Sequence, residues 1–254
     1  MNITILQDHY NRKYVSESSA SQIKLIKQVK IPTTRYEAVV KFLPLYFKGG
    51  DIIELGAGNG NVAKTLLNLP HMNITHYTLA DISQPRLEGL LKNMEDSRVS
   101  ILLMDAEDIP QSEFGKYDAV IMIALIEHLI DPLRAMQRIR QLLKPGGFVY
   151  IDTPNFARYT LRLKLLMGYF PSTASTNEGL TKYSGEECDL YDEGHMHYFT
   201  YLSLSLMLTE RCDFSKVIML PYPVGRIPLG KHIHNYLAKI WPGLFSELAL
   251  IAYT

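Results

Sequence analysis

Apolar and polar positions alternate in blocks along the middle of the chain, and the blocks predict strands separated by helices. Segments between the apolar runs keep helical spacing, with apolar residues every three or four positions. The run at 117–124 is apolar almost throughout, which is typical of a strand buried on both faces. Strand and helix alternate about five times, which predicts an α/β fold with a doubly wound parallel sheet. The expected strands are 52–53, 74–80, 99–104, 117–124 and 148–152, and the expected helices are 62–69, 85–94 and 131–143.

The first 48 residues are richer in polar side chains than the middle of the chain. Apolar Ile23 and Ile26, flanked by lysines, favour a short amphipathic helix, and a second helix is expected over 35–43. We interpret residues 1–48 as a helical cap over the main domain, which would then comprise residues 49–254.

The alternation stops after residue 153. Residues 155–197 contain a predicted helix at 158–167 and then a polar stretch rich in Ser, Thr, Gly and Glu. A long insertion of this kind in a compact domain is usually a lid or a substrate-binding loop. Regular structure is expected to return with a helix at 202–210 and strands at 214–220 and 248–253.

Composition narrows the class of protein. The 254 residues include 26 Lys plus Arg and 26 Asp plus Glu, and this balance argues against a nucleic-acid partner, which usually requires a basic surface. The N-terminal sequence has no secretory pattern, and no apolar run is long enough to cross a bilayer. We therefore expect a soluble cytoplasmic protein.

A glycine-rich loop follows the first predicted strand. Gly56, Gly58 and Gly60 come directly after Glu54 at the strand end, and glycine allows backbone N–H groups to approach a ligand closely. The dinucleotide fingerprint G-x-G-x-x-G would need a glycine at Asn61, so NAD and FAD are disfavoured. A purely structural tight turn remains an alternative for this loop by itself.

Acidic residues end three successive predicted strands. Glu54, Asp81 and Asp105 would share one edge of the sheet, and Asp81 is suitably placed to accept both hydroxyls of a ribose. Each acid by itself could instead cap the helix after it. Three in register after a glycine loop favour a nucleotide-like ligand.

Taken together, these motifs resemble the class I S-adenosylmethionine-dependent methyltransferases. The resemblance implies a Rossmann-like sheet of seven strands, mostly parallel, with the last strand antiparallel and a lid before the sixth. It also implies S-adenosylmethionine as the cofactor and S-adenosylhomocysteine as its product. The matching segments, in family order, are 54–60, Asp81, 105–110, 117–120, 125–128 and 143–147.

The resemblance also implies residue roles. The glycine loop, with Glu54, Gly56, Ala57, Gly58, Asn59 and Gly60, would hold the methionine part of the cofactor. Asp81 would bind the ribose and Ile82 would pack on the adenine, whose edge would meet Asp105, Ala106 and Glu107. Ala124 and Leu125 would border the sulfonium.

Segments 126–128 and 194–200 are similar to those of ubiquinone-type O-methyltransferases and of enzymes that tailor sugars or natural products. His128 would then lie beside the transferred methyl group, and imidazole titrates near neutral pH, so His128 is a candidate general base. His195 and His197 are two residues apart and would point to the same side if the backbone is extended. We predict all three as catalytic.

Other interpretations stay open at this stage. His195 and His197 could bind a divalent metal with Glu127 or His128, although no metal motif supports this and we expect none. Alternatively, the histidines could only pack the lid. The preferred function is transfer of a methyl group to a small-molecule hydroxyl by a monomer or homodimer. N-methylation of a small amine, and a non-catalytic cofactor-binding subunit, are the alternatives.

Overall fold

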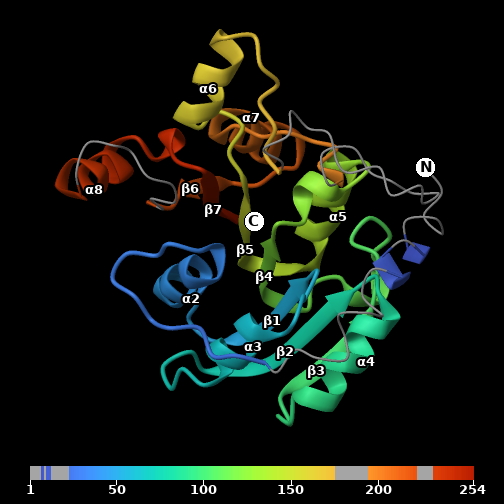
Figure 1. The fold of residues 1–254 in the computed structure, drawn as a ribbon. Coiled ribbons are helices and arrows are strands. Elements are labelled where there is room, and N and C mark those ends of the chain that lie inside the picture. Colours follow the sequence, from blue (N-terminus) through green and yellow to red (C-terminus); the bar gives the residue numbers. More distant parts are fainter. Residues whose placement is uncertain (1–6, 9, 13–22, 175–193, 222–230) are drawn as a thin grey trace.

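The computed structural model describes residues 7–8, 10–12, 23–174, 194–221 and 231–254. Within them a seven-stranded sheet runs in the order β3-β2-β1-β4-β5-β7-β6, as Figure 1 shows. β7 is antiparallel to both of its neighbours, and the other pairs are parallel. This order confirms the predicted Rossmann-like sheet. The strands are β1 (Gly50–Leu55), β2 (Ile74–Asp81), β3 (Val99–Leu103), β4 (Tyr117–Ile123), β5 (Leu143–Pro154), β6 (Lys216–Met219) and β7 (Glu247–Tyr253).

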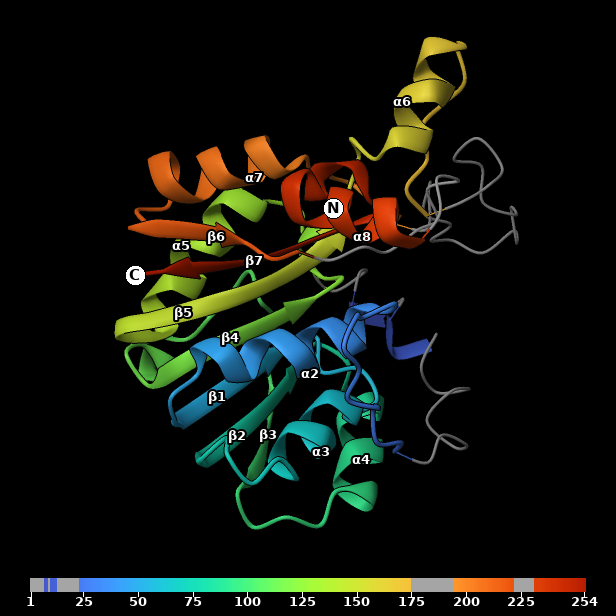
Figure 2. The same ribbon diagram turned by 90° about the vertical axis from the view of Figure 1, so that its left-hand side faces the viewer.

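Helices cover both faces of the sheet and form two separate apolar cores (Figure 2). One core lies under α2 (Arg35–Tyr46), α3 (Asn61–Leu67) and α4 (Gln84–Asn93). The other lies under α5 (Pro132–Leu142), α7 (Tyr201–Leu206) and the π-helical turn η4 (Met207–Arg211). Because β1 and β4 lie side by side but lead into helices on opposite faces, the crevice of this doubly wound sheet opens between their carboxyl ends.

The predicted start of α5 is confirmed. The side chain of Asp131 accepts a hydrogen bond from the backbone N–H of Arg134, and Pro132 occupies the first turn. An acidic cap followed by proline satisfies one of the orphan N–H groups and fixes a helical φ in advance.

The prediction of an amphipathic helix around Ile23 and Ile26 is wrong. Residues 23–30 have no regular secondary structure. The backbone N–H groups of Lys24 and Ile26 donate instead to the side chains of Asn61 and Thr65, at 2.8 and 2.9 Å. Because both backbone N–H groups donate to side chains of α3, they do not form the hydrogen bonds of a helix.

β5 begins earlier than predicted. The predicted helix ends at 143 and the predicted strand begins at 148, but β5 already starts at Leu143. Its register with β4 shifts between the Leu143 and Phe148 pairings. Gly147 runs so close to its neighbours that a Cβ there would lie 3.0 Å from the carbonyl of Asp118. Glycine at position 147 therefore lets β5 run close beside β4.

Three shorter elements connect the layers: η1 (Gln111–Glu113), η2 (Ile126–His128) and η5 (Pro242–Leu244). Two further helices extend from the sheet edge, α6 (Tyr159–Leu166) and α8 (Lys231–Ile240); α8 had no helical prediction. Much of the predicted cap (1–6, 9 and 13–22) and of the predicted insertion (175–193) lies outside the described residues. Among the described residues, no helix has the length and apolar character needed to cross a membrane.

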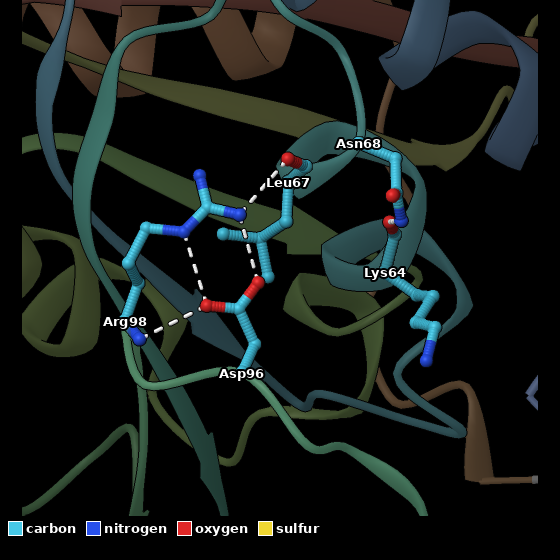
Figure 3. Close-up of polar contacts among 5 residues, drawn as sticks. All are labelled: Lys64, Leu67, Asn68, Asp96 and Arg98. Atoms are coloured by element: carbon cyan, nitrogen blue, oxygen red, sulfur yellow. Dashed lines mark hydrogen bonds and ion pairs between the residues drawn. The ribbon is translucent and has the colours of Figure 1, made fainter.

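An ion pair fixes the loop between α4 and β3 (Figure 3). Arg98 donates from Nε and from an Nη to the two carboxylate oxygens of Asp96, at 3.0 and 2.7 Å. The same side chain donates to the carbonyl of Leu67 at 3.0 Å. It therefore joins the C-terminal turn of α3 to the start of β3.

Candidate active site

The glycine loop between β1 and α3 has a backbone that requires glycine. Gly56, Gly58 and Gly60 have φ of 67°, 56° and 70°, in the left-handed region that other residues rarely adopt. A Cβ on Gly60 would lie 2.7 Å from the side chains of Leu90 and Met94, so this glycine lets α4 pack closely. Among the described residues, a Cβ on Gly58 would meet only the carbonyl of Gly56, at 4.0 Å. The loop is therefore packed on one side and open on the other.

Glu54 is buried at the end of β1, beneath this loop. The hydroxyl of Tyr77 donates to its carboxyl group at 2.6 Å. Burial raises the pKa of Glu54 to about 8, because the charged form would lose its hydration. Glu54 is therefore held largely as a neutral acid at neutral pH.

Asp81 ends β2 next to the glycine loop. Its carboxylate accepts the backbone N–H of Ser83 at 2.9 Å and lies 3.8 Å from the guanidinium of Arg86. Burial raises its pKa, and Arg86 opposes that shift. The carbonyl of the next residue, Ile82, accepts a bond from Gln7 at 3.2 Å. The N-terminal segment therefore reaches the edge of the predicted nucleotide site.

The acids after β3 have different surroundings. Asp105 accepts the backbone N–H of Glu107 at 2.8 Å, and burial raises the pKa of Asp105. Glu107 accepts the N–H groups of Ile130 and Asp131, at 3.0 and 2.7 Å. Its carboxylate thus joins the loops after β3 and β4. The adenine-binding roles of Asp105, Ala106 and Glu107 stay predictions.

The loop after β4 lies beside the glycine loop in space. Ala124 has a positive φ of 49° and donates its N–H to the carbonyl of Asp152 at 2.9 Å. Leu125 then lies 3.4 Å from where a Cβ of Gly56 would stand. The carboxyl ends of β1 and β4 therefore meet, as a site at the switch point requires.

Glu127 and His128 follow directly in η2, and they are brought to His195 by backbone contacts. The carbonyl of Glu127 accepts the N–H groups of Met196 and His197, at 2.9 and 3.2 Å. The rings of His128 and His195 lie edge to face, with centroids 4.8 Å apart.

The His128 ring has a defined orientation. Its Nδ1 lies 3.0 Å from the carbonyl of Gly194. A carbonyl only accepts, so Nδ1 carries the proton and the lone pair of the neutral ring is on Nε2. His195 is held in turn by a 2.7 Å bond between its Nδ1 and the hydroxyl of Thr173.

Glu127, His128 and His195 form one polar group. Their potential ligand atoms all lie within 4.8 Å of one another. Thr153 donates to Glu127 at 2.8 Å, and burial raises the pKa of this acid to about 7. His197 is not part of the group, because its Nε2 donates to the carbonyl of Ile130 at 3.1 Å.

A buried charged cluster near this group was not predicted. Arg35 of α2 lies 3.4 Å from Glu247 of β7 and 4.0 Å from Asp152 of β5. Burial raises the pKa of both acids, that of Asp152 strongly. Among the described residues, neither oxygen of Asp152 has a hydrogen-bond partner. Sequence reasoning missed this cluster because its members lie far apart in the chain and belong to no motif.

The residues at the β1–β2 edge fit S-adenosylmethionine. The open side of Gly58 leaves room for a ligand against the backbone, and the buried Asp81 carboxylate is an acceptor suited to ribose hydroxyls. The meeting of Leu125 with the glycine loop supplies an apolar border next to that cradle.

Comparison with known proteins defines the class. A family model described as "Methyltransferase domain" matches residues 28–217. The chain belongs to this family, the class I S-adenosylmethionine-dependent methyltransferases, and S-adenosylmethionine is its cofactor.

The sequence identity to individual relatives is low. The chain is 28% identical over 109 residues to "Ubiquinone biosynthesis O-methyltransferase" of Xanthomonas oryzae pv. oryzae (strain PXO99A), which covers 42% of this chain and 44% of that protein. It therefore spans less than half the length of this curated relative.

Solved structures share the fold. A "possible histamine N-methyltransferase" of Thermotoga maritima has a TM-score of 0.55 at 16% identity, covering 97% of this chain and 95% of that one. The CurJ carbon methyltransferase has a TM-score of 0.52 at 18% identity, covering 82% and 49%. These names include transfer to oxygen, nitrogen and carbon, so the likeness does not define the acceptor atom.

Proposed function

We propose that this methyltransferase transfers the methyl group to a hydroxyl of a small molecule such as a sugar, natural product or quinone-like compound, with His128 as the general base. The observation that carries this proposal is the bond from Nδ1 of His128 to the carbonyl of Gly194. It fixes the ring at the end of β4 with its basic nitrogen defined. A base in this position is required for a hydroxyl acceptor, which must lose a proton.

In the proposed reaction the bound cofactor supplies an electrophilic methyl group. Asp81 and the glycine loop hold the cofactor, and Leu125 borders its reactive end. Nε2 of His128 accepts the proton that leaves the acceptor oxygen. His195 lies against the edge of the His128 ring and limits its rotation, so His195 acts as a positioning residue.

A second candidate is N-methylation of a small amine. The buried Glu127 and Asp152 and the partly buried Glu247 lie around Arg35, and carboxyl groups of this kind bind ammonium groups. The two functions differ in the group that acts as the base. A hydroxyl acceptor would lose its proton to His128, whereas an ammonium acceptor would lose its proton to a carboxylate before the neutral amine attacks the methyl group.

The test is a screen of paired acceptors, in which each hydroxyl compound is compared with its amino and O-blocked analogues. Methylated products are detected by mass spectrometry. The proposal predicts product from hydroxyl acceptors and none from the O-blocked analogues. Product from amines alone would support the second candidate. Turnover abolished by EDTA and restored by a divalent cation would instead assign Glu127, His128 and His195 to a metal.

A further inference from the structure

Two helices expose large apolar side chains, which is unusual for a soluble surface. On and after α6, Leu166 is 83% exposed and Leu165 is 60% exposed. On and after α8, Trp241 is 53% exposed. We call these exposed apolar side chains, together with the cations on the same two segments, the apolar-basic surface. Its exposed apolar members are Leu163, Leu165, Leu166, Met167, Tyr169, Ile233, Tyr236, Ile240 and Trp241.

The charges around these side chains have a single sign. Residues 156–174 and 231–246 contain no Asp or Glu, although the whole chain has as many acids as bases. The cations of these segments whose side chains the structure describes are Arg162, Lys164 and Lys239, together with Arg158, which is half-buried and interacts with Glu247. Both segments that expose these apolar groups therefore carry an excess of positive charge.

The two segments are joined by hydrogen bonds where they leave the sheet. Asn155, the residue after β5, donates from its side chain to the carbonyls of Gly243 and Phe245, at 2.9 and 2.7 Å. Its backbone N–H donates to the carbonyl of Ser246 at 2.9 Å. Asn155 therefore ties the start of the α6 segment to the end of the α8 segment. Both helices extend from the end of the sheet at which β5 ends (Figures 1 and 2).

We propose that the apolar-basic surface binds the interface of an anionic lipid bilayer. Helices with exposed leucine and tryptophan and with lysine or arginine bind membranes in this way, through apolar burial and attraction to acidic headgroups. The attraction between cations and acidic headgroups is modest for each charge, so binding would be reversible and weakened by salt. It would be peripheral, since no described helix could span the bilayer.

A second copy of the chain fits this surface less well. In a two-fold dimer the same patch meets itself, so Arg162 and Lys164 would face identical cations. With no acid in either segment, nothing on the patch would compensate the repulsion. An anionic surface supplies the missing charge.

Trp241 makes the proposal measurable, because it is the only tryptophan of the chain. Its fluorescence reports on this surface alone. We expect a blue shift when the protein is mixed with vesicles of phosphatidylglycerol and phosphatidylcholine. Vesicles of phosphatidylcholine alone should give little shift, and 0.5 M salt should reverse the change. No methyl transfer is needed, so the outcome is independent of the proposed reaction.

Variants decide whether the apolar-basic surface is responsible. Leu165→Glu combined with Leu166→Glu should reduce co-sedimentation with anionic vesicles at least tenfold, and Lys239→Glu should reduce it severalfold. Leu91→Glu is the matched control, because Leu91 is 58% exposed but lies on α4, outside this surface. Circular dichroism of each variant verifies folding.

Two results would overturn the proposal. One is the absence of any fluorescence shift with anionic vesicles. The other is equal sedimentation of the wild type and the Leu165→Glu, Leu166→Glu variant. A wild-type dimer that this variant converts to a monomer, without vesicle binding, would assign the surface to a second copy instead.

Discussion

The two halves of the sheet edge are built in different ways. In the half formed by β1, β2 and β3, the buried acids have partners close at hand: Glu54 has Tyr77, and Asp81 has Ser83. In the half formed by β5 and β7, Asp152 is buried beside Glu247 and Arg35 without a hydrogen bond to a described residue. In the first half the fold itself supplies a hydrogen-bond donor to each of the two buried acids. The second keeps polar groups that a ligand or water would complete.

The largest expected effect concerns Glu54 and the pH dependence of stability. Its pKa is raised from 4.5 to about 8 in the fold, so its contribution is fully present below pH 4.5 and is lost as pH rises through 8. The shift corresponds to about 5 kcal/mol. In Glu54→Gln the loss of stability between pH 5 and pH 9 should be smaller by up to that amount.

Urea unfolding of wild type and variant at pH 5, 7 and 9 measures this difference. Glu95→Gln, at an exposed position, is the control and should follow the wild type. If Glu54→Gln loses as much stability as the wild type, the carboxyl group of Glu54 is not held neutral, and the contrast between the two halves weakens.

His128→Asn should lower turnover about 100-fold or more, the usual contribution of a general base. Cofactor affinity should stay within threefold, because the ring lies beyond the glycine loop. Single-turnover rates and calorimetric titration separate the two quantities. His71→Asn, at an exposed histidine in the turn between α3 and β2, serves as control. Full turnover in His128→Asn would leave the ring with a packing role.

Asp81→Ala should weaken S-adenosylmethionine binding about tenfold or more, or about 1.4 kcal/mol. The reason is that the buried carboxylate is the acceptor expected for the ribose hydroxyls. Calorimetric titration with S-adenosylhomocysteine gives the affinity, and the exposed Asp108, replaced by alanine, provides the control. Unchanged affinity would remove Asp81 from the ribose role.

Arg98→Met should have the smallest effect, a loss of about 1 kcal/mol in stability, because Arg98 is partly exposed and its pair with Asp96 is screened by water. It lies in the β1–β2–β3 half but contacts no predicted cofactor residue. Cofactor affinity should therefore stay at the wild-type value. A clear change in affinity would mean that the loop before β3 helps to shape the site.

The sequence predicted one half of the edge far better than the other, for a physical reason. Glycines, strand-end acids and the proline at the start of α5 act through local backbone geometry, so their pattern is visible in the chain itself. The cluster of Arg35, Asp152 and Glu247 exists only after α2, β5 and β7 pack together. The helix expected at Ile23 failed for the same reason, because its backbone donors bind side chains of α3.

The position of β7 determines when the sheet can be completed during synthesis of the chain. β7 follows β6 in the chain but lies between β5 and β6, pairing Phe148 of β5 with Tyr253. While the chain leaves the ribosome, β5 therefore has an open edge and β6 has no neighbour until β7 has emerged. Open strand edges are prone to pair with other chains. A nascent chain paused before residue 247 would be the form most in need of a chaperone.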